Sequence, residues 1–568
     1  MIMVLGKLWQ LFTPAERYKG LGVMVLIVVM AGLETAGVVS IMPFLSVLGR
    51  PEVIHENPWL NRLYETWNFV DERTFIIALG TASIVLVVGS SLCKTFTLYA
   101  LNSFVHQERH SISNRLLSRY LHQPYEFFLS RNSADLSKNI LSETDQLLFN
   151  LVQPLAQMVA QGAVVVAIAL LILWYDPWMA LFVLLGLAIF YSIIYSIVRR
   201  KLGRAGAERV VANRDRYQAS SEALGGIKDV KITHSAAAYM ARFENSSQLY
   251  SRHLATNDTL SQTPLYLVEA VAYSSLILIA LTLLLRTNDV SQVLPTLGLY
   301  GFAAYRLLPA AQIIYRGFAK LRFSSSALES IHRDLMLPEL PELKADGLLI
   351  PRREICLESI RFAYPAAPDK LVLKDYNLVI PANSSIGIVG SSGAGKSTVM
   401  DLLLGLLSPQ AGTLSVDGIP VTSANLANWQ CAIGYVPQHI YLTDTSVAEN
   451  IAFGVTLDQI DMIAIERAAC AAQIHDFIVA ELPEGYDTVV GERGIRLSGG
   501  QRQRIGIARA LYFDPPVLFM DEATSALDSQ TESAVSEAVR NLSHCKTIVV
   551  IAHKVESLRY CDRVVAVN

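Results

Sequence analysis

The chain has 568 residues, which is enough for several domains. Apolar residues make up 52% and charged residues only 17%, whereas soluble domains are about a quarter charged, so a membrane-embedded part is expected. The formal net charge of −3 gives no support to a nucleic-acid partner, and none is expected.

The apolar residues collect before about residue 335. A helix needs about 20 mostly apolar residues to cross the hydrocarbon core of a membrane. Six segments qualify: Leu21–Val47, Phe75–Phe104, Val152–Trp174, Trp178–Val198, Leu265–Leu285 and Val293–Phe318. Two shorter stretches, Leu8–Tyr18 and Pro58–Tyr64, are expected to be helices that lie along the membrane surface.

The charged loops predict the orientation. Residues 199–262 contain eleven Lys or Arg, and the first outer loop, 47–74, contains three. By the positive-inside rule, the long loops, both termini and the C-terminal domain are cytoplasmic, which predicts a multi-pass protein of the inner (plasma) membrane. The loop tips Pro124–Ala134 and Ala223–Thr233 are candidate contacts to the C-terminal domain, and solvated helical hairpins are the alternative.

A linker with two prolines, Leu337–Glu342, separates two domains, because proline cannot continue a helix. We expect residues 1–335 to form a polytopic α-helical membrane domain with six transmembrane helices. Residues 336–568 read as a soluble α/β domain, and the motifs below predict a P-loop NTPase fold for it.

A phosphate-binding loop lies between a β-like run, Ser384–Val389, and an amphipathic run, Val399–Leu407. Strand, G-x-x-x-x-G-K-S loop and helix is the arrangement of a P-loop, whose backbone N–H groups face the phosphates of ATP. Lys396 is expected to reach the terminal phosphates and Ser397 to bind Mg²⁺. The candidate ATP-binding residues are Gly390, Ser391, Ser392, Gly393, Ala394, Gly395, Lys396, Ser397 and Thr398.

A second strand, Val517–Met520, ends in two carboxylates. A strand that is apolar throughout suits the centre of a parallel sheet, and ligands of such sheets bind at the carboxyl ends of the strands. Asp521 is expected to hold Mg²⁺ through water, and Glu522 to act as general base on the attacking water.

The segment Leu497–Arg504, with sequence LSGGQRQR, resembles the signature motif of ATP-binding cassette (ABC) proteins. A serine and two glycines at a helix start form an anion-binding nest. In the family this nest completes the ATP site of the opposite subunit, so the resemblance implies a dimer, with a second copy as the expected partner. The residues of this second half-site are Ser498, Gly499, Gly500 and Gln501.

The remaining family motifs follow in order along the chain. Tyr364 resembles the residue that stacks on adenine, although core packing is the alternative for a lone tyrosine. Gln438 resembles the Q-loop glutamine, which contacts Mg²⁺ and water, and Asp528 resembles the D-loop aspartate of the dimer interface. His553 resembles the switch histidine on the terminal phosphate. The resemblance thus assigns catalysis to Glu522, His553 and Gln438.

Val490–Gly494 resembles a motif of ABC exporters, and the likeness to half-size exporters covers the chain. Short patches, Leu33–Thr35, Ile41–Phe44 and Tyr305–Pro309, resemble flippases of lipid-linked oligosaccharides. A cation at mid-membrane usually faces a cavity or a partner, so Arg306 and Lys94 are the substrate candidates.

Other roles for these charges stay open: Lys94 can instead reach the interface or pair with Glu269, and Glu34 is expected to form a structural or gating pair.

The predicted function is an ATP hydrolase that exports or flips an amphiphile with an anionic head, with a polyprenyl-pyrophosphate-linked oligosaccharide as first choice. A lipid A-like lipid or multidrug exporter is the alternative within this class. A membrane-bound regulatory ATPase that transports nothing is the alternative from another class.

Overall fold

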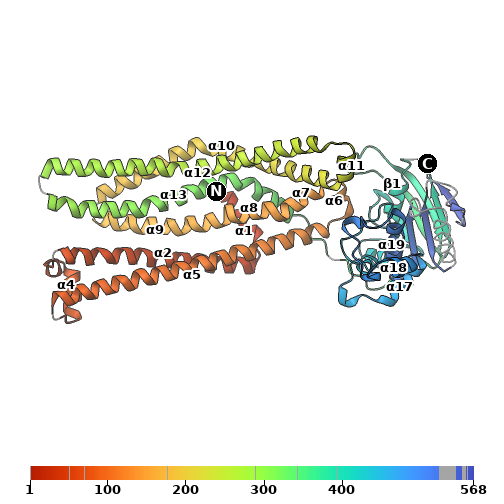
Figure 1. Cartoon of the computed structure of the whole chain (residues 1–568), viewed down its shortest axis with the longest axis horizontal. Helices are drawn as coiled ribbons and strands as arrows, with labels where there is room; N and C mark the ends of the chain where they lie inside the picture. The colour runs from red at the N-terminus through yellow and green to blue at the C-terminus, as the bar shows by residue number, and fades with distance from the viewer. Residues whose placement is uncertain are drawn as a thin grey trace. The chain divides into compact units, whose positions relative to one another are not determined.

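The structure is a computed structural model that describes residues 2–49, 51–69, 71–175, 177–287, 290–341, 343–391, 393–522, 545–552, 558–559 and 561–567. The chain divides into two compact units (Figure 1). The first comprises Met1–Leu121 and Arg131–Glu339, and the second His122–Ser130 and Leu340–Asn568. This division differs from the predicted 1–335 and 336–568 chiefly because the loop tip 122–130 belongs to the second unit.

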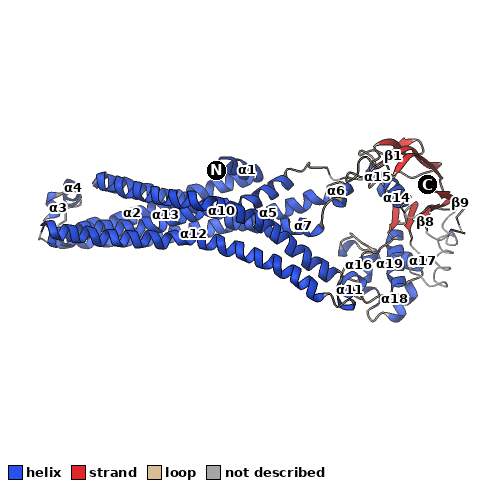
Figure 2. Cartoon of the chain, turned by 90° about the horizontal axis from the view of Figure 1, so that it is seen from above, coloured by secondary structure: helices blue, strands red, loops and turns tan. Residues whose placement is uncertain are grey.

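The first unit is helical (Figure 2). Its helices are α1 (Ile2–Leu11), α2 (Pro14–Gly49), α3 (Val53–Glu56), α4 (Pro58–Thr66), α5 (Glu72–Leu121), α7 (Ser133–Lys138), α8 (Thr144–Leu147), α9 (Gln153–Tyr175), α10 (Pro177–Gly225), α11 (Ile227–Ile232), α12 (Ala236–Thr287) and α13 (Val290–Leu335). Two π-helical turns, η1 (Asn139–Glu143) and η2 (Leu148–Val152), flank α8.

The six predicted spans lie in α2, α5, α9, α10, α12 and α13. Among the described residues, three helical stretches are long and apolar enough to cross a membrane: Pro14–Gly49, Glu72–Leu121 and Ser133–Leu170. The other three predicted spans run through side chains that lie outside the described residues. The predicted short helix at Pro58–Tyr64 is confirmed as α4, and the two predicted loop tips contain α6 (Tyr125–Leu129) and α11.

The predicted surface helix Leu8–Tyr18 is wrong in its bounds, because the chain breaks between α1 and α2. Thr13 caps the second helix: its Oγ1 accepts from the backbone N–H of Glu16 at 3.4 Å, and the Glu16 carboxylate accepts from the N–H of Thr13 at 2.7 Å. This reciprocal pair forms a capping box, and Pro14 at the first helical position needs no hydrogen-bond partner for its nitrogen.

The second unit contains two sheets. The antiparallel sheet has the order β2-β1-β4-β5, from β1 (Glu354–Phe362), β2 (Leu373–Pro381), β4 (Ala411–Val416) and β5 (Ile419–Pro420). The parallel sheet has the order β6-β7-β8-β3-β9, from β3 (Ser385–Val389), β6 (Ile433–Val436), β7 (Val517–Asp521), β8 (Thr547–Ile551) and β9 (Arg563–Ala566).

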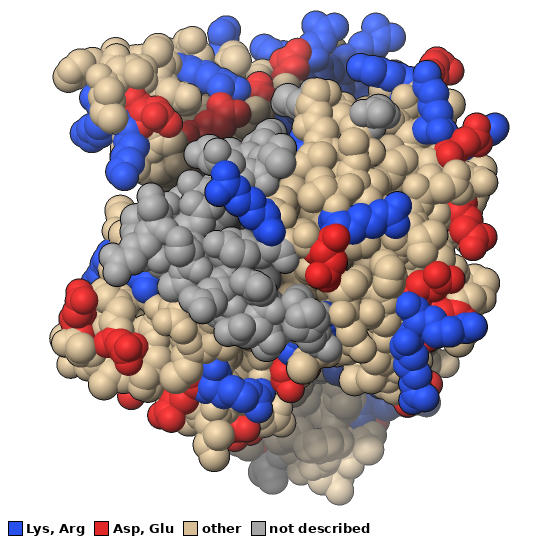
Figure 3. All heavy atoms as spheres, turned by 90° about the vertical axis from the view of Figure 1, so that its right-hand side faces the viewer, with Lys and Arg blue, Asp and Glu red and all other residues tan. Residues whose placement is uncertain are grey.

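The helices of the second unit are α6, α14 (Lys396–Leu403), α15 (Leu426–Gln430), α16 (Val447–Ile451), α17 (Met462–Ala471), α18 (His475–Glu481) and α19 (Gly499–Leu511). In Figure 3, which faces this unit, basic and acidic side chains are interspersed over the atoms drawn in colour. Every residue of β7 is buried, as expected for a strand with both faces covered. Since β3, β8 and β7 are parallel neighbours, their carboxyl ends share one edge.

Candidate nucleotide site

The loop between β3 and α14 requires glycine at several positions. Gly393 and Gly395 have φ of +83° and +96°, a region that side chains disfavour. A Cβ at Gly390 would lie 2.5 Å from the carbonyl oxygen of Val567. The chain therefore turns tightly from β3 into the N-terminus of α14, where backbone N–H groups offer an anion site. Ser392 lies outside the described residues.

Lys396 opens α14 and is 7% exposed. Its Nζ donates to the carbonyl oxygens of Gly390 at 2.9 Å and Ser391 at 3.0 Å. A buried ammonium usually needs an anionic partner, whereas these two acceptors are neutral. The lysine is thus held beside the loop in a position that suits a phosphate. Ser397, the next residue, is exposed, so its hydroxyl is accessible to a metal ion.

The carboxylates follow β7, as predicted. Asp521 is 8% exposed and pairs in register with Ile551 of β8. Glu522 has φ of +50°, a strained conformation for a side chain of this type. Its backbone N–H donates to Ile551 O at 2.9 Å, and its carbonyl oxygen accepts from Gln503 Nε2 at 3.2 Å. These contacts hold the strained residue in place.

The side chain of Glu522 is held by the predicted Q-loop residue. Gln438 Nε2 donates to Glu522 Oε2 at 2.8 Å. Gln438 follows β6 and Glu522 follows β7, which are neighbours in the parallel sheet. Two residues far apart in sequence therefore meet at one edge, and the amide fixes the direction of the carboxylate.

Tyr364 lies against the first turn of α14. Its hydroxyl forms a 2.9 Å hydrogen bond with Thr398 Oγ1, and its ring meets Phe362 edge-on with centroids 5.1 Å apart. Thr398 is buried. The tyrosine is thus next to the phosphate loop, and its stacking on adenine stays a prediction.

Sequence reasoning missed Asp401, one turn further along α14. Burial, reinforced by the charge of Asp521, raises the pKa of Asp401 to about 6. Burial and the charge of Asp401 also raise the pKa of Tyr125 on α6. The neighbouring Glu126 Oε1 accepts from the backbone N–H of Ser408 at 3.2 Å. The available signal was a single acidic residue inside the otherwise uncharged amphipathic run Val399–Leu407.

The signature serine begins α19. Ser498 Oγ accepts from the N–H of Gln501 at 3.2 Å, and Gln501 Oε1 accepts from the N–H of Ser498 at 2.7 Å. Ser498 is exposed, and Gly499 and Gly500 are partly exposed. The nest is therefore accessible to a second molecule. Asp528 and His553 lie outside the described residues.

Of the two substrate candidates in the membrane part, Lys94 lies among the described residues. Lys94 Nζ lies 3.0 Å from Glu34 Oε1 and joins α5 to α2. Lys94 is half exposed, whereas the Glu34 side chain is 10% exposed. Glu34 thus forms a pair, as expected, and its partner is Lys94, for which the sequence had suggested Glu269. The side chain of Arg306, within α13, lies outside the described residues.

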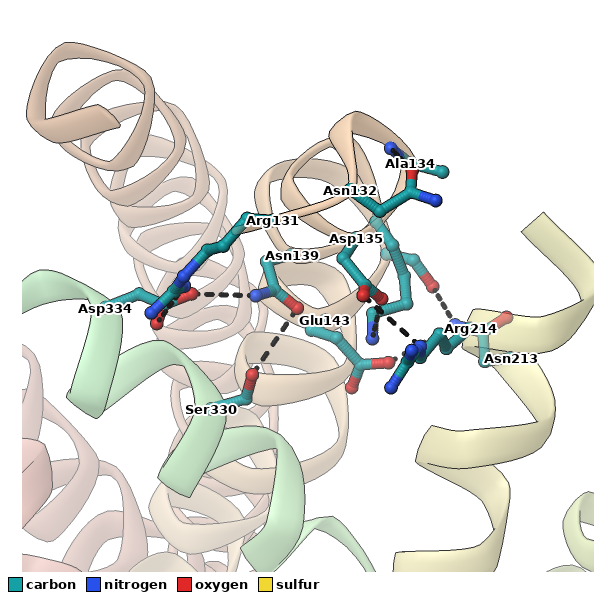
Figure 4. A network of polar contacts seen from close by, with 12 residues as sticks. Arg131, Asn132, Ala134, Asp135, Asn139, Glu143, Asn213, Arg214, Ser330 and Asp334 are labelled. Atoms are coloured by element: carbon teal, nitrogen blue, oxygen red, sulfur yellow. Dashed lines mark hydrogen bonds and ion pairs between the residues drawn. The ribbon is translucent and has the colours of Figure 1, made fainter. Parts of the chain in front are cut away.

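A polar network joins the helices near the points where the chain leaves the first unit (Figure 4). Asp334 is fully buried and accepts from Tyr120 Oη at 2.6 Å, Asn139 Nδ2 at 2.8 Å and Arg131 at 3.2 Å. Figure 4 also shows Glu143, which accepts from Arg209 at 2.7 Å, with both side chains fully buried. The network ties α5, η1, α10 and α13 together.

Comparison with known proteins gives two family matches. Residues 54–296 match the ABC transporter transmembrane region, and residues 373–525 match the ABC transporter family model. The ATP-dependent lipid A-core flippase of Cupriavidus metallidurans is 31% identical over 493 residues, covering 85% of this chain and 82% of that protein. The mitochondrial ATP-binding cassette sub-family B member 10 of Mus musculus is 30% identical over 534 residues, covering 91% and 71%.

The fold is similar to a solved structure, that of a bacterial Atm1-family ABC exporter with ATP bound. The TM-score is 0.75 at 22% identity, and the likeness covers 98% of this chain and 94% of the other. At this identity the likeness supports the fold, and the helical and α/β parts of the two chains correspond.

Proposed function

Because the chain belongs to the ABC transporters, as an exporter-type half-transporter that couples ATP hydrolysis to transport, we propose that it flips an anionic glycolipid of the lipid A type. The lipid moves from the cytoplasmic to the outer leaflet of the inner membrane. The observation that carries this proposal is the extent of the similarity. An alignment of 493 residues to a lipid A-core flippase is more than twice as long as residues 336–568, so it reaches far into the helical part.

The first choice from sequence, a polyprenyl-pyrophosphate-linked oligosaccharide, finds no support among these relatives. Flippases from Cupriavidus metallidurans and Psychrobacter arcticus, each 31% identical, both carry the name lipid A-core flippase. The lipid A-like alternative fits them better. The two candidate lipids are both amphiphiles with a phosphorylated head. The candidate substrate residues Arg306 and Lys94 would therefore bind a phosphate group in either case.

In the nucleotide site, Lys396 contacts the terminal phosphates of ATP, which replace its two carbonyl partners. Ser397, Asp521 and Gln438 would hold Mg²⁺. Bound Mg²⁺ neutralises phosphate charge during phosphoryl transfer. Glu522, aimed by Gln438, takes a proton from the attacking water. The fit is supported by the glycine-lined loop and by the two buried groups of opposite charge, Lys396 and Asp521.

A second copy of the chain completes each site. The nest of Ser498, Gly499 and Gly500, exposed at the serine and partly exposed at the glycines, offers N–H groups to the terminal phosphate bound by the partner. The resemblance to ABC proteins would assign Asp528 to the dimer contact and His553 to the same phosphate. Closure of the two cassettes changes the relative stability of the two states of the helical part, and hydrolysis resets it.

The test is transport in phosphatidylcholine vesicles that contain lipid A, a polyprenyl-pyrophosphate-linked oligosaccharide, or neither. We expect lipid A to raise ATP hydrolysis and to change leaflet only with ATP. Glu522→Gln vesicles serve as the control for leakage. If only the polyprenyl lipid raised the ATPase rate and changed leaflet, lipid A would be excluded as the substrate. If no lipid changed the ATPase rate, the result would contradict a lipid flippase.

A further inference from the structure

A cavity of about 550 Å³ lies within the first unit, between α1, α9, α10 and α13. Its walls are largely apolar, with Leu5 from α1 and Leu155 from α9. Tyr195 of α10 and Phe318 of α13 form an aromatic side, with ring centroids 5.9 Å apart. Such walls suit the hydrocarbon part of an amphiphile.

Three arginines also line this cavity: Arg199 and Arg200 from α10, and Arg322 from α13. All three are exposed, and among the residues that the structure describes none of them has a carboxylate within ion-pair distance. Like charges that line one cavity repel one another, and arginine binds phosphate through two parallel N–H donors. The cluster is therefore arranged for an anion that the chain itself does not supply.

Two glycines bring the third arginine to the other two. A Cβ at Gly206 would lie 2.0 Å from the carbonyl oxygen of Phe323, so α10 and α13 touch through their backbones at this point. A Cβ at Gly203 would lie 2.8 Å from Nε of Arg322. The guanidinium of Arg322 thus rests on α10, one turn from Arg199, on the face that positions four apart share.

The cavity lies where the predicted spans end on the cytoplasmic side. Arg199 directly follows the span Trp178–Val198, and Arg322 comes four residues after the span that ends at Phe318. Cations at this depth lie at the level of lipid headgroups, while Leu155, Tyr195 and Phe318 extend toward the hydrocarbon region. A charged head and an apolar body therefore both find matching surfaces.

We propose that this cavity binds the phosphorylated headgroup of a lipid of the cytoplasmic leaflet. Arg199, Arg200 and Arg322 bind the phosphate, and the first part of the lipid body lies on the apolar walls. The identity of that lipid as the transported glycolipid rests on the proposed function, whereas the site does not. The volume admits a headgroup and excludes a complete glycolipid, so the acyl chains stay in the membrane.

The test measures lipid binding directly, in nanodiscs of phosphatidylcholine titrated with lipid A or with phosphatidylglycerol. The variant is Arg199→Gln, Arg200→Gln and Arg322→Gln together, in the full chain. We expect its affinity for lipid A to fall at least ~10-fold, because each arginine loses charge-assisted hydrogen bonds to phosphate. The matched control removes three exposed cations that do not line the cavity: Lys201→Gln, Arg204→Gln and Arg252→Gln.

A second variant keeps the test valid if the triple variant fails to fold. Leu155→Trp fills the cavity and leaves all three arginines in place, and it should weaken lipid A binding as well. Unchanged binding in either folded variant, or an equal loss in the control, overturns the site. Phosphatidylglycerol could also bind as tightly as lipid A and lose its affinity in the triple variant. That result would support the site and contradict lipid A as the substrate.

Discussion

The buried ion pair of the helical unit and the buried lysine of the nucleotide loop differ in the partners that hold them. In the helical unit, Glu143 and Arg209 neutralise each other with no exposure, and Asp334 is buried among Tyr120, Asn139 and Arg131. In the second unit, Lys396 is nearly as buried, but its contacts in the described part of the chain are carbonyl oxygens.

This difference separates structural charges from charges kept for a ligand. A buried ion that is paired with another ion helps to hold one conformation. If its partner is removed, the remaining charge destabilises that conformation. A buried ion with weak neutral partners can exchange them for a phosphate at little cost. Glu522 is only partly buried; its strained backbone is held by Ile551 and Gln503, and its carboxylate accepts from the neutral amide of Gln438.

The largest effect is expected from Glu522→Gln. The amide cannot take a proton, so ATP hydrolysis should fall by about 10²–10⁴-fold, while ATP binding is kept and the dimer stays closed. Single-turnover hydrolysis and nucleotide binding measure the two quantities. Normal turnover would exclude Glu522 as the base. If the thermal unfolding of Glu522→Gln were unchanged, Glu522 would contribute to catalysis and not to stability.

The next effect concerns the fully buried pair. Arg209→Met leaves Glu143 buried without its cation and should lower the free energy of unfolding by about 3–5 kcal/mol. The double variant Glu143→Leu with Arg209→Met removes both charges, and it should recover most of that loss. Thermal unfolding in detergent micelles gives the comparison. A single variant as stable as the native chain would show that the pair is not structural.

A smaller effect is expected at Asp334→Asn, which keeps the shape and removes the charge. Its hydrogen bonds from Tyr120 and Arg131 weaken, and we expect a loss of about 1–3 kcal/mol. Asp145→Asn is the matched control, because Asp145 pairs with Arg109 at the surface and should cost less than about 1 kcal/mol. Equal losses of stability in Asp334→Asn and Asp145→Asn would show that burial does not make the Asp334 carboxylate more important than the surface one.

The smallest effect is expected at Asp417→Asn. Burial alone would raise the pKa of Asp417, but hydrogen bonds from the backbone N–H groups of Glu354, Arg352 and Arg353 lower it below its ordinary value. The ionised form thus stabilises the fold above about pH 4, and this contribution is lost as the pH falls through the lowered pKa. We expect a loss of about 1 kcal/mol or less at pH 7, because the carboxylate is largely hydrated. If the difference in stability between the native chain and Asp417→Asn were as large at pH 3 as at pH 7, the predicted role of the ionised carboxylate would be contradicted.

Sequence predicted best where a local pattern carries the information. The six apolar runs lie on six long helices, and the glycine loop and the acidic pair follow β3 and β7 because strand, loop and helix are encoded within a few residues. The sequence suggested Glu269 as a partner of Lys94, whereas the partner is Glu34, because the pairing depends on which helices pack together. The same holds for the proximity of Asp401 to Asp521 and for the contact of Gln503 with Glu522, because both depend on how helices pack against the sheet.

The loop tip 122–130 gives the chain an unusual connectivity. Because this segment belongs to the second unit, the polypeptide passes between the units three times, after Leu121, after Ser130 and after Glu339. A rotation of the second unit therefore cannot be absorbed by the proline-containing linker alone, since the ends of α5 and α7 must move with it. A protease that cuts only the linker would leave the cassette still held through α6, with mechanical communication weakened rather than abolished.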